Sequence, residues 1–243
     1  HRAPRLHGRP VLHRVTTTAC TDAAVAIGER LMRSPRGLVR LSVPKAYGKF
    51  VVGPLMPAFL QRYPEVDVQL RISDQSPDLI EDGFDLLVLV TDNPPEGLAG
   101  KPLGPVRQLL CASPDYLSTA PAIDTPAALE DHACILFAAQ GRHWYYRHGE
   151  KEQAEEITPR LTCNQIRAAS LACVQGLGIT RLMHYQVADE LADGRLVRVL
   201  RDYEPKDLPI QLVYPHALQL SPRVRAFVEW ACPRLERGLP GLG

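Results

Sequence analysis

Residues 37–90 have the sequence GLVRLSVPKAYGKFVVGPLMPAFLQRYPEVDVQLRISDQSPDLIEDGFDLLVLV, and their apolar pattern decides the fold. Apolar runs at 38–43 and 86–90 and an alternating pattern at 66–72 predict three strands. After the first strand, apolar residues recur at helical spacing and predict a helix over 51–62. This order of strands and helices predicts right-handed crossovers and hence a parallel sheet.

A second, short helix is expected at 77–82, because Gly83 offers a left-handed C-cap at little cost. Ligands of parallel sheets lie beyond the carboxyl ends of the strands. The loops that follow the three predicted strands are 44–48, 73–76 and 91–97. Any binding site in this half of the chain is therefore expected in these loops.

Strand patterns continue through the rest of the chain. Two segments, 144–148 and 157–163, are expected to pair as antiparallel strands around the charged turn GEKEQAEE. Apolar runs predict further strands at 104–112, 133–137, 179–183, 196–200 and 209–214.

Helical patterns alternate with these strands. Asn164 is expected to cap a helix over 165–175, and an amphipathic helix is expected from residue 222 onward. The layout predicts two similar α/β lobes, joined by two connections near 105–112 and 207–214. A ligand site is expected in the cleft between such lobes.

The charge of the chain is nearly balanced, with 28 basic and 27 acidic residues. Residues 1–40 nevertheless hold eight arginines against Asp22 and Glu29, which gives this arm a net charge of +6. Such an arm is typical either of contact with phosphate or of a solvated basic tail. Charge alone does not decide between the two.

The cysteines and the absence of long apolar runs bear on the compartment. Six cysteines are spread over the chain without a C-x-x-C pair, so they are expected to be reduced and mostly buried. No apolar run reaches the length of a membrane span, about 18 residues, and the start shows no signal-peptide pattern. These features predict a cytoplasmic protein with no membrane partner.

Four segments of the chain carry a family resemblance: the first part of the quoted stretch, DLIEDGFDLLVLV, GLAGKPLGPVRQLLCASPDYL and SPRVRAFVEW. In this order they closely resemble the effector-binding domain of LysR-type transcriptional regulators. The resemblance implies two Rossmann-like lobes of the type 2 periplasmic-binding-protein fold within residues 37–243. Lobe I would comprise about 37–110 and 212–243, and lobe II about 111–211.

Residues 1–36 resemble a different part of the family. RLHGRPVLHRVTTTACTDAA is similar to the end of the family's DNA-binding domain, where the wing leads into the linker helix. These residues are therefore expected to be a remnant of a winged helix-turn-helix and a short linker helix. The recognition helix has no counterpart, so specific DNA binding by this chain alone is not expected.

The resemblance implies that a small molecule binds between the lobes, and we expect this molecule to be an anion such as a carboxylate. Ala46 stands where the family commonly has Ser or Thr, and Lys45 could supply positive charge at the start of a helix. The expected ligand-binding residues are Lys45, Ala46, Tyr47, Thr91, Phe137, Trp144, Asn164 and Gln165. For Lys45 a plain surface position, for Trp144 core packing and for Asn164 simple helix capping remain alternatives.

No pattern of catalytic residues is present. The eight histidines lack metal-ligand spacing, the GLG at 176–178 marks the end of a helix, and no G-x-S-x-G elbow occurs. We therefore expect no enzyme activity, no metal and no cofactor.

The function that the resemblance implies is effector sensing and assembly, as a homodimer or tetramer, within a LysR-type regulator. A solute-binding protein of a transporter and an enzyme on the same scaffold are the alternatives. The wing-like segment and the reduced cysteines disfavour the transporter protein, and the lack of a catalytic constellation disfavours the enzyme.

Overall fold

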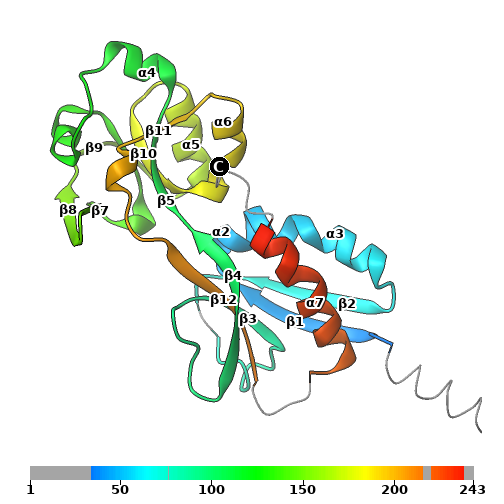
Figure 1. The fold of residues 1–243 in the computed structure, drawn as a ribbon. Helices are drawn as coiled ribbons and strands as arrows, with labels where there is room; N and C mark the ends of the chain where they lie inside the picture. The colour runs from blue at the N-terminus through cyan, green and yellow to red at the C-terminus, as the bar shows by residue number, and fades with distance from the viewer. Residues whose placement is uncertain (1–33, 76, 216–219, 238–243) are drawn as a thin grey trace, which may run out of the picture.

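Two α/β lobes make up the chain in this computed structural model, which describes residues 34–75, 77–215 and 220–237 (Figure 1). The expected wing remnant and linker helix fall almost entirely in residues 1–33, outside the described residues. None of the helices in the described ranges is long and apolar enough to cross a bilayer.

Lobe I is built on a five-stranded sheet with the order β2-β1-β3-β12-β4. β1 pairs in parallel with β2 and β3, so the predicted parallel arrangement of these three strands is confirmed. β12 is antiparallel to β3 and β4, which makes the whole sheet mixed. The strands are β1 (Gly37–Val43), β2 (Val66–Ile72), β3 (Leu86–Val90), β4 (Leu98–Val106) and β12 (Leu208–Pro215).

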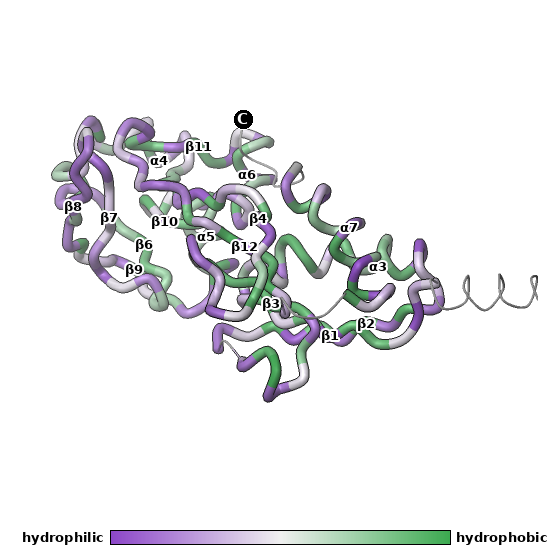
Figure 2. Tube along the Cα trace, turned by 60° about the horizontal axis from the view of Figure 1, so that its bottom comes forward, coloured by the Kyte–Doolittle hydropathy of each residue, from purple (hydrophilic) through white to green (hydrophobic). Residues whose placement is uncertain are grey.

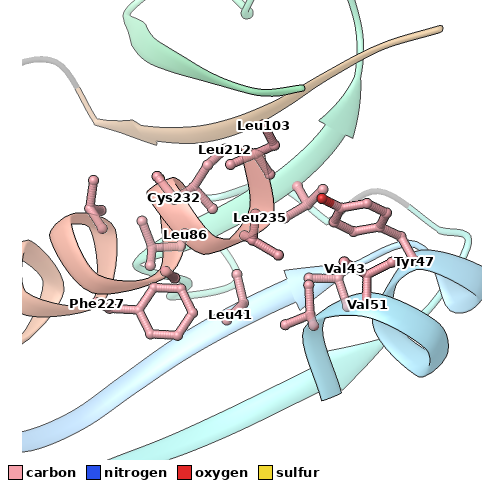
Figure 3. Packing of buried hydrophobic residues seen from close by; sticks show 14 of the residues in the cluster. Leu41, Val43, Tyr47, Val51, Leu86, Leu103, Leu212, Phe227, Cys232 and Leu235 are labelled. Carbon is pink, nitrogen blue, oxygen red and sulfur yellow. The ribbon is translucent and has the colours of Figure 1, made fainter. Parts of the chain in front are cut away.

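Helices cover one face of this sheet. The predicted first helix begins earlier than expected, because α2 (Lys45–Tyr47), a π-helical segment (Gly48–Val52) and α3 (Gly53–Arg62) follow one another without a break. α7 (Pro222–Arg237) lies beside α3, and their aromatic rings meet, with the ring centroids of Phe59 and Phe227 5.0 Å apart. Figure 3 shows the apolar side chains of α7 packed over β1 and against those of α2.

Lobe II repeats the arrangement of lobe I. Its sheet has the order β11-β5-β10-β6-β9. Read from β2 in lobe I and from β9 in lobe II, each sheet has two parallel pairings followed by two antiparallel ones. The prediction of two similar lobes is therefore confirmed. The strands are β5 (Gln108–Ala112), β6 (Cys134–Phe137), β9 (Pro159–Cys163), β10 (Ile179–Met183) and β11 (Val197–Val199).

Short helices flank the sheet of lobe II. The α-helices are α4 (Pro114–Thr119), α5 (Ile166–Val174) and α6 (Ala188–Ala192). The 3-10 helices are Pro126–Asp131, Ala138–Gln140, His184–Gln186 and Arg201–Tyr203.

The expected hairpin in lobe II was wrong. β7 (His143–His148) pairs with β8 (Lys151–Glu156), so the segment taken for a charged turn is itself a strand, and β9 instead joins β6 in parallel. The turn between β7 and β8 is tight. Gly149 in this turn has a φ of 63°, a left-handed conformation that favours glycine. The hairpin is largely hydrophilic (Figure 2), so no alternation of apolar residues marks β8.

Two further expectations about elements were also wrong. Residues 77–82 form hydrogen-bonded turns rather than a helix, with the Asp78 carboxylate accepting from the N–H groups of Ile80 and Glu81. The strand expected at 104–112 is interrupted at Arg107, where the chain leaves the sheet of lobe I for that of lobe II. The expected boundaries between the lobes, near 110 and 211, therefore fall inside β5 and β12, a few residues after each of these strands begins.

The lobes touch where the chain crosses between them. The backbone N–H of Arg107 donates to His184 Nδ1 at 3.0 Å, and the His184 N–H donates to the Arg107 carbonyl at 2.9 Å. The next residue, Tyr185, places its ring 5.7 Å from that of Tyr47 and 6.4 Å from that of Phe50, both in lobe I. An aromatic contact therefore joins the start of the first helix to lobe II.

Candidate functional site

A cavity of about 410 Å³ lies at the carboxyl ends of β1, β2 and β3. Each of the three loops predicted for a binding site contributes residues to this cavity. All the residues that line the cavity belong to lobe I: Ser42, Val43, Pro44, Ser73, Asp74, Gln75, Pro77, Leu87, Val88, Leu89, Val90, Thr91, Asn93 and Pro95.

Hydrogen bonds hold the loops around the cavity in place. Thr91 Oγ1 donates to the Asn93 carbonyl at 2.6 Å and accepts from the Asn93 N–H at 3.2 Å. Gln211 Nε2, from β12, donates to the carbonyls of Thr91 at 3.1 Å and Asp92 at 2.8 Å. A Cβ on Gly100 would collide with the Gln211 side chain, so a glycine there makes room for it. The cavity rim is therefore preorganised.

Lys45, which was expected to attract a ligand anion, is instead paired with Asp74 of the protein. Lys45 donates its backbone N–H to Asp74 Oδ1 at 3.0 Å, and its Nζ lies 3.5 Å from Asp74 Oδ2. Asp74 is the charged side chain among the lining residues, and sequence reasoning did not single it out. A carboxylate of the protein thus already occupies the helix start where a ligand anion was expected.

The two residues that follow Lys45 point inward to different degrees. Ala46 is half-buried, whereas Tyr47 is fully buried in the core of lobe I. Burial raises the pKa of Tyr47 and raises that of Tyr185 to about 12. Among the described residues, the Tyr47 hydroxyl has no hydrogen-bond partner. Tyr47 therefore links the site to lobe II rather than lining the cavity.

The expected residues of lobe II lie apart from the cavity. Phe137 ends β6 and is half-buried, while Asn164 and Gln165 are exposed. The helix α5 begins at Ile166 with Gln165 as its N-cap and without a side-chain capping bond, so the capping role expected of Asn164 was wrong. Trp144 is 1% exposed and belongs to the core of lobe II, so core packing, the alternative given above, describes it.

Among the described residues, no group of three or more His, Cys, Asp or Glu side chains could hold a metal ion. The five described cysteines are free thiols, and four of them are buried. Burial raises the pKa of Cys134 and of Cys232 to about 11, which keeps both thiols protonated at neutral pH.

Two lobes of matching topology, joined by crossing connections, with a cavity at the strand ends, define a ligand-binding domain of the periplasmic-binding-protein type. The family model of the LysR substrate binding domain matches residues 32–235. This chain therefore belongs to the LysR substrate-binding domain family.

Relatives and solved structures agree with this assignment. The chain is 41% identical over 172 residues to the "Probable HTH-type transcriptional regulator LtrA" of Klebsiella pneumoniae, and the match covers 70% of this chain and 55% of that protein. The regulatory domain of AphB from Vibrio vulnificus superposes with a TM-score of 0.72 at 27% identity, covering 82% of this chain and 98% of that one. Full-length AphB from Vibrio cholerae superposes with a TM-score of 0.70 at 25% identity, and the match covers 87% of this chain and 74% of AphB.

The coverage of the curated relatives is partial. The match spans 55% of LtrA and 66% of the Escherichia coli regulator YhjC, which is 29% identical over 208 residues. The chain thus corresponds to one part of these longer proteins.

Proposed function

We propose that this chain is the effector-sensing and dimerising part of a LysR-type transcriptional regulator. The observation that carries the proposal is the cavity at the strand ends, in a domain whose relatives are named as transcriptional regulators. Such a regulator would act on DNA in the cytoplasm through a helix-turn-helix. The relatives do not favour a solute-binding protein of a transporter.

The proposed ligand is a small molecule with a carboxylate and an apolar body. A volume of about 410 Å³ suits such a molecule. Apolar walls come from Val43, Val88 and Val90, and hydroxyls of Ser42 and Ser73 offer hydrogen bonds. The ligand carboxylate would compete with Asp74 for Lys45. The proposed contacts in lobe I are Lys45, Ala46 and Thr91. Phe137, Asn164 and Gln165 of lobe II lie apart from this cavity and would contact a part of the ligand that extends beyond it.

A thermal-shift experiment tests this proposal. Aromatic and aliphatic carboxylates are expected to raise the melting temperature, because binding to the native state alone stabilises it by mass action. Lys45→Glu should reduce the shift several-fold, since it replaces attraction of the carboxylate by repulsion. Lys151→Glu, in the exposed hairpin, is the matched control and should leave the shift unchanged. A shift with neutral sugars or cations but with none of the carboxylates would contradict the proposed ligand class.

A further inference from the structure

Arg181 is a buried cation whose charge no carboxylate balances. It lies on β10 with 4% of its surface exposed. Its Nη1 donates to the carbonyl of His143 at 3.3 Å and its Nη2 to that of Gln140 at 3.1 Å. The ion pairs of the described residues all involve other basic side chains. Burial lowers the pKa of Arg181 to about 10, so the guanidinium is still charged at neutral pH.

Unused hydrogen-bonding groups gather around this guanidinium. Within the described part of the chain, Arg181 Nε, Trp144 Nε1 and Gln140 Oε1 are buried without a partner. The guanidinium carbon lies 5.8 Å from the centroid of the Trp144 ring, so the two residues that carry these unpaired donors are neighbours. A guanidinium has five N–H donors, and the two carbonyls satisfy two of them. Leaving buried donors of a charged group unpaired is costly, which favours a site that binds an acceptor.

Two other cations, Lys45 and Arg107, are already paired. Lys45 is exposed and holds Asp74, and Arg107 lies 3.2 Å from Asp207. An anionic ligand must displace a carboxylate to reach Lys45, whereas no carboxylate of the described residues forms an ion pair with Arg181. An anion at Arg181 would therefore meet a cation whose charge is still available.

The cover over Arg181 also connects it to the proposed ligand contacts. The carbonyls that it binds belong to residues 138–143, which run from the end of β6 to the start of β7. Most side chains of this segment are exposed, and it directly follows Phe137. A small outward movement of the segment would open a path to the guanidinium from the carboxyl end of β6.

We propose that Arg181 and Trp144 form an anion site in lobe II, covered by residues 138–143, that takes a small carboxylate and is separate from the contact proposed at Lys45. This inference goes beyond the proposed function, so the two sites can be tested apart. The carboxylate would accept from Arg181 Nε and Trp144 Nε1, the two donors that have no partner in the described chain. The carbonyls of His143 and Gln140 are bound to Nη1 and Nη2, so they can keep these hydrogen bonds once the carboxylate is in place.

Fluorescence of Trp144 tests the site directly. The chain has two tryptophans, so Trp230→Phe leaves Trp144 as the only reporter. In this background, sodium formate and sodium acetate should change the emission saturably, whereas formamide and acetamide, which are neutral and of similar shape, should not. Arg181→Met should weaken the response at least about tenfold, and Arg181→Lys less, because the lysine keeps the charge. An equal response in Arg181→Met, or no saturable response with Arg181 present, would overturn the proposal.

Controls distinguish anion binding by Arg181 from a purely structural role of this residue. They also distinguish failure of the anion site from failure of the proposed function. Circular dichroism melts establish that each variant folds, and Arg181→Gln replaces Arg181→Met if the latter does not. If Arg181 only anchors residues 138–143, its variants melt at lower temperature and anions leave Trp144 unchanged in every protein. If carboxylates still raise the melting temperature while Trp144 does not respond, the proposed function stands and the anion site is wrong.

Discussion

Single residues set the charge of the cavity, and Asp74 is the most informative of them. Its carboxylate occupies the donors at Lys45 that a ligand carboxylate would need. We expect Asp74→Asn to enlarge the thermal shift produced by carboxylates several-fold. Without ligand its effect on stability should stay within about 1 kcal/mol, because the ion pair is exposed. Asp124→Asn, an exposed position of equal charge, is the control, and an unchanged shift in Asp74→Asn would contradict competition at Lys45.

His184 gives a prediction about pH. Burial lowers its pKa, and its Nδ1 accepts the N–H of Arg107, so the folded state favours the neutral ring. Charged groups that face it are Arg107, Arg198 and Asp207. Because its folded pKa lies below the unfolded value, about 6.5, its contribution to stability is complete above that pH and is lost as the pH falls through the folded pKa.

Melting temperatures measured between pH 8 and pH 5 test whether stability falls with pH as predicted. The wild-type protein should lose more stability on acidification than His184→Asn, in which an amide oxygen can still accept from Arg107 but does not titrate. His148→Asn, an exposed position, should behave like the wild type. Parallel pH profiles for the wild type and His184→Asn would show that this ring does not contribute.

Among elements, the 3-10 segment that carries Tyr185 joins the lobes by packing. Tyr185→Ala removes two aromatic contacts with lobe I and should lower the free energy of unfolding by about 2–3 kcal/mol. Tyr185→Phe keeps the ring and should cost less than about 1 kcal/mol. Urea denaturation measures both, and equal effects of the two substitutions would show that the hydroxyl rather than the ring matters.

Elements with a clear apolar pattern could be predicted from the sequence, and others could not. β1, β2 and β3 bury apolar residues in runs or alternation, so both their positions and the loops at their ends were predicted correctly. β8 is almost entirely exposed, so its register depends on pairing with β7 rather than on a pattern of its own. Asp74 and Gln211 could not be predicted as site residues, because their partners lie 29 and about 120 residues away.

At the scale of the whole molecule, we expect a two-fold dimer in which α3 of one protomer packs against α5 of its partner. Both helices retain exposed apolar side chains, with Leu60 37% and Leu171 40% exposed. Leu60→Glu or Leu171→Glu should weaken dimerisation at least about tenfold. Light scattering at about 10–50 µM measures the mass, in a range where a specific interface holds.

Ile80→Glu is the matched control for the dimer. Ile80 is 75% exposed but lies in the turns after β2, away from both helices, so its substitution should leave the mass unchanged. A wild-type protein that stays monomeric at these concentrations would contradict this interface.

The two connections between the lobes are tied to each other at one point, since Arg107 of the first lies 3.2 Å from Asp207 of the second. A joint of this kind resists sliding of one lobe along the other but permits rotation about an axis through the crossing. Small rotations there move α4 and the far end of β2 through much larger arcs than they move the cavity. A ligand that shifts the loops only slightly would therefore change the angle between the lobes. This change would move surfaces far from the ligand by larger distances than the loops that the ligand contacts.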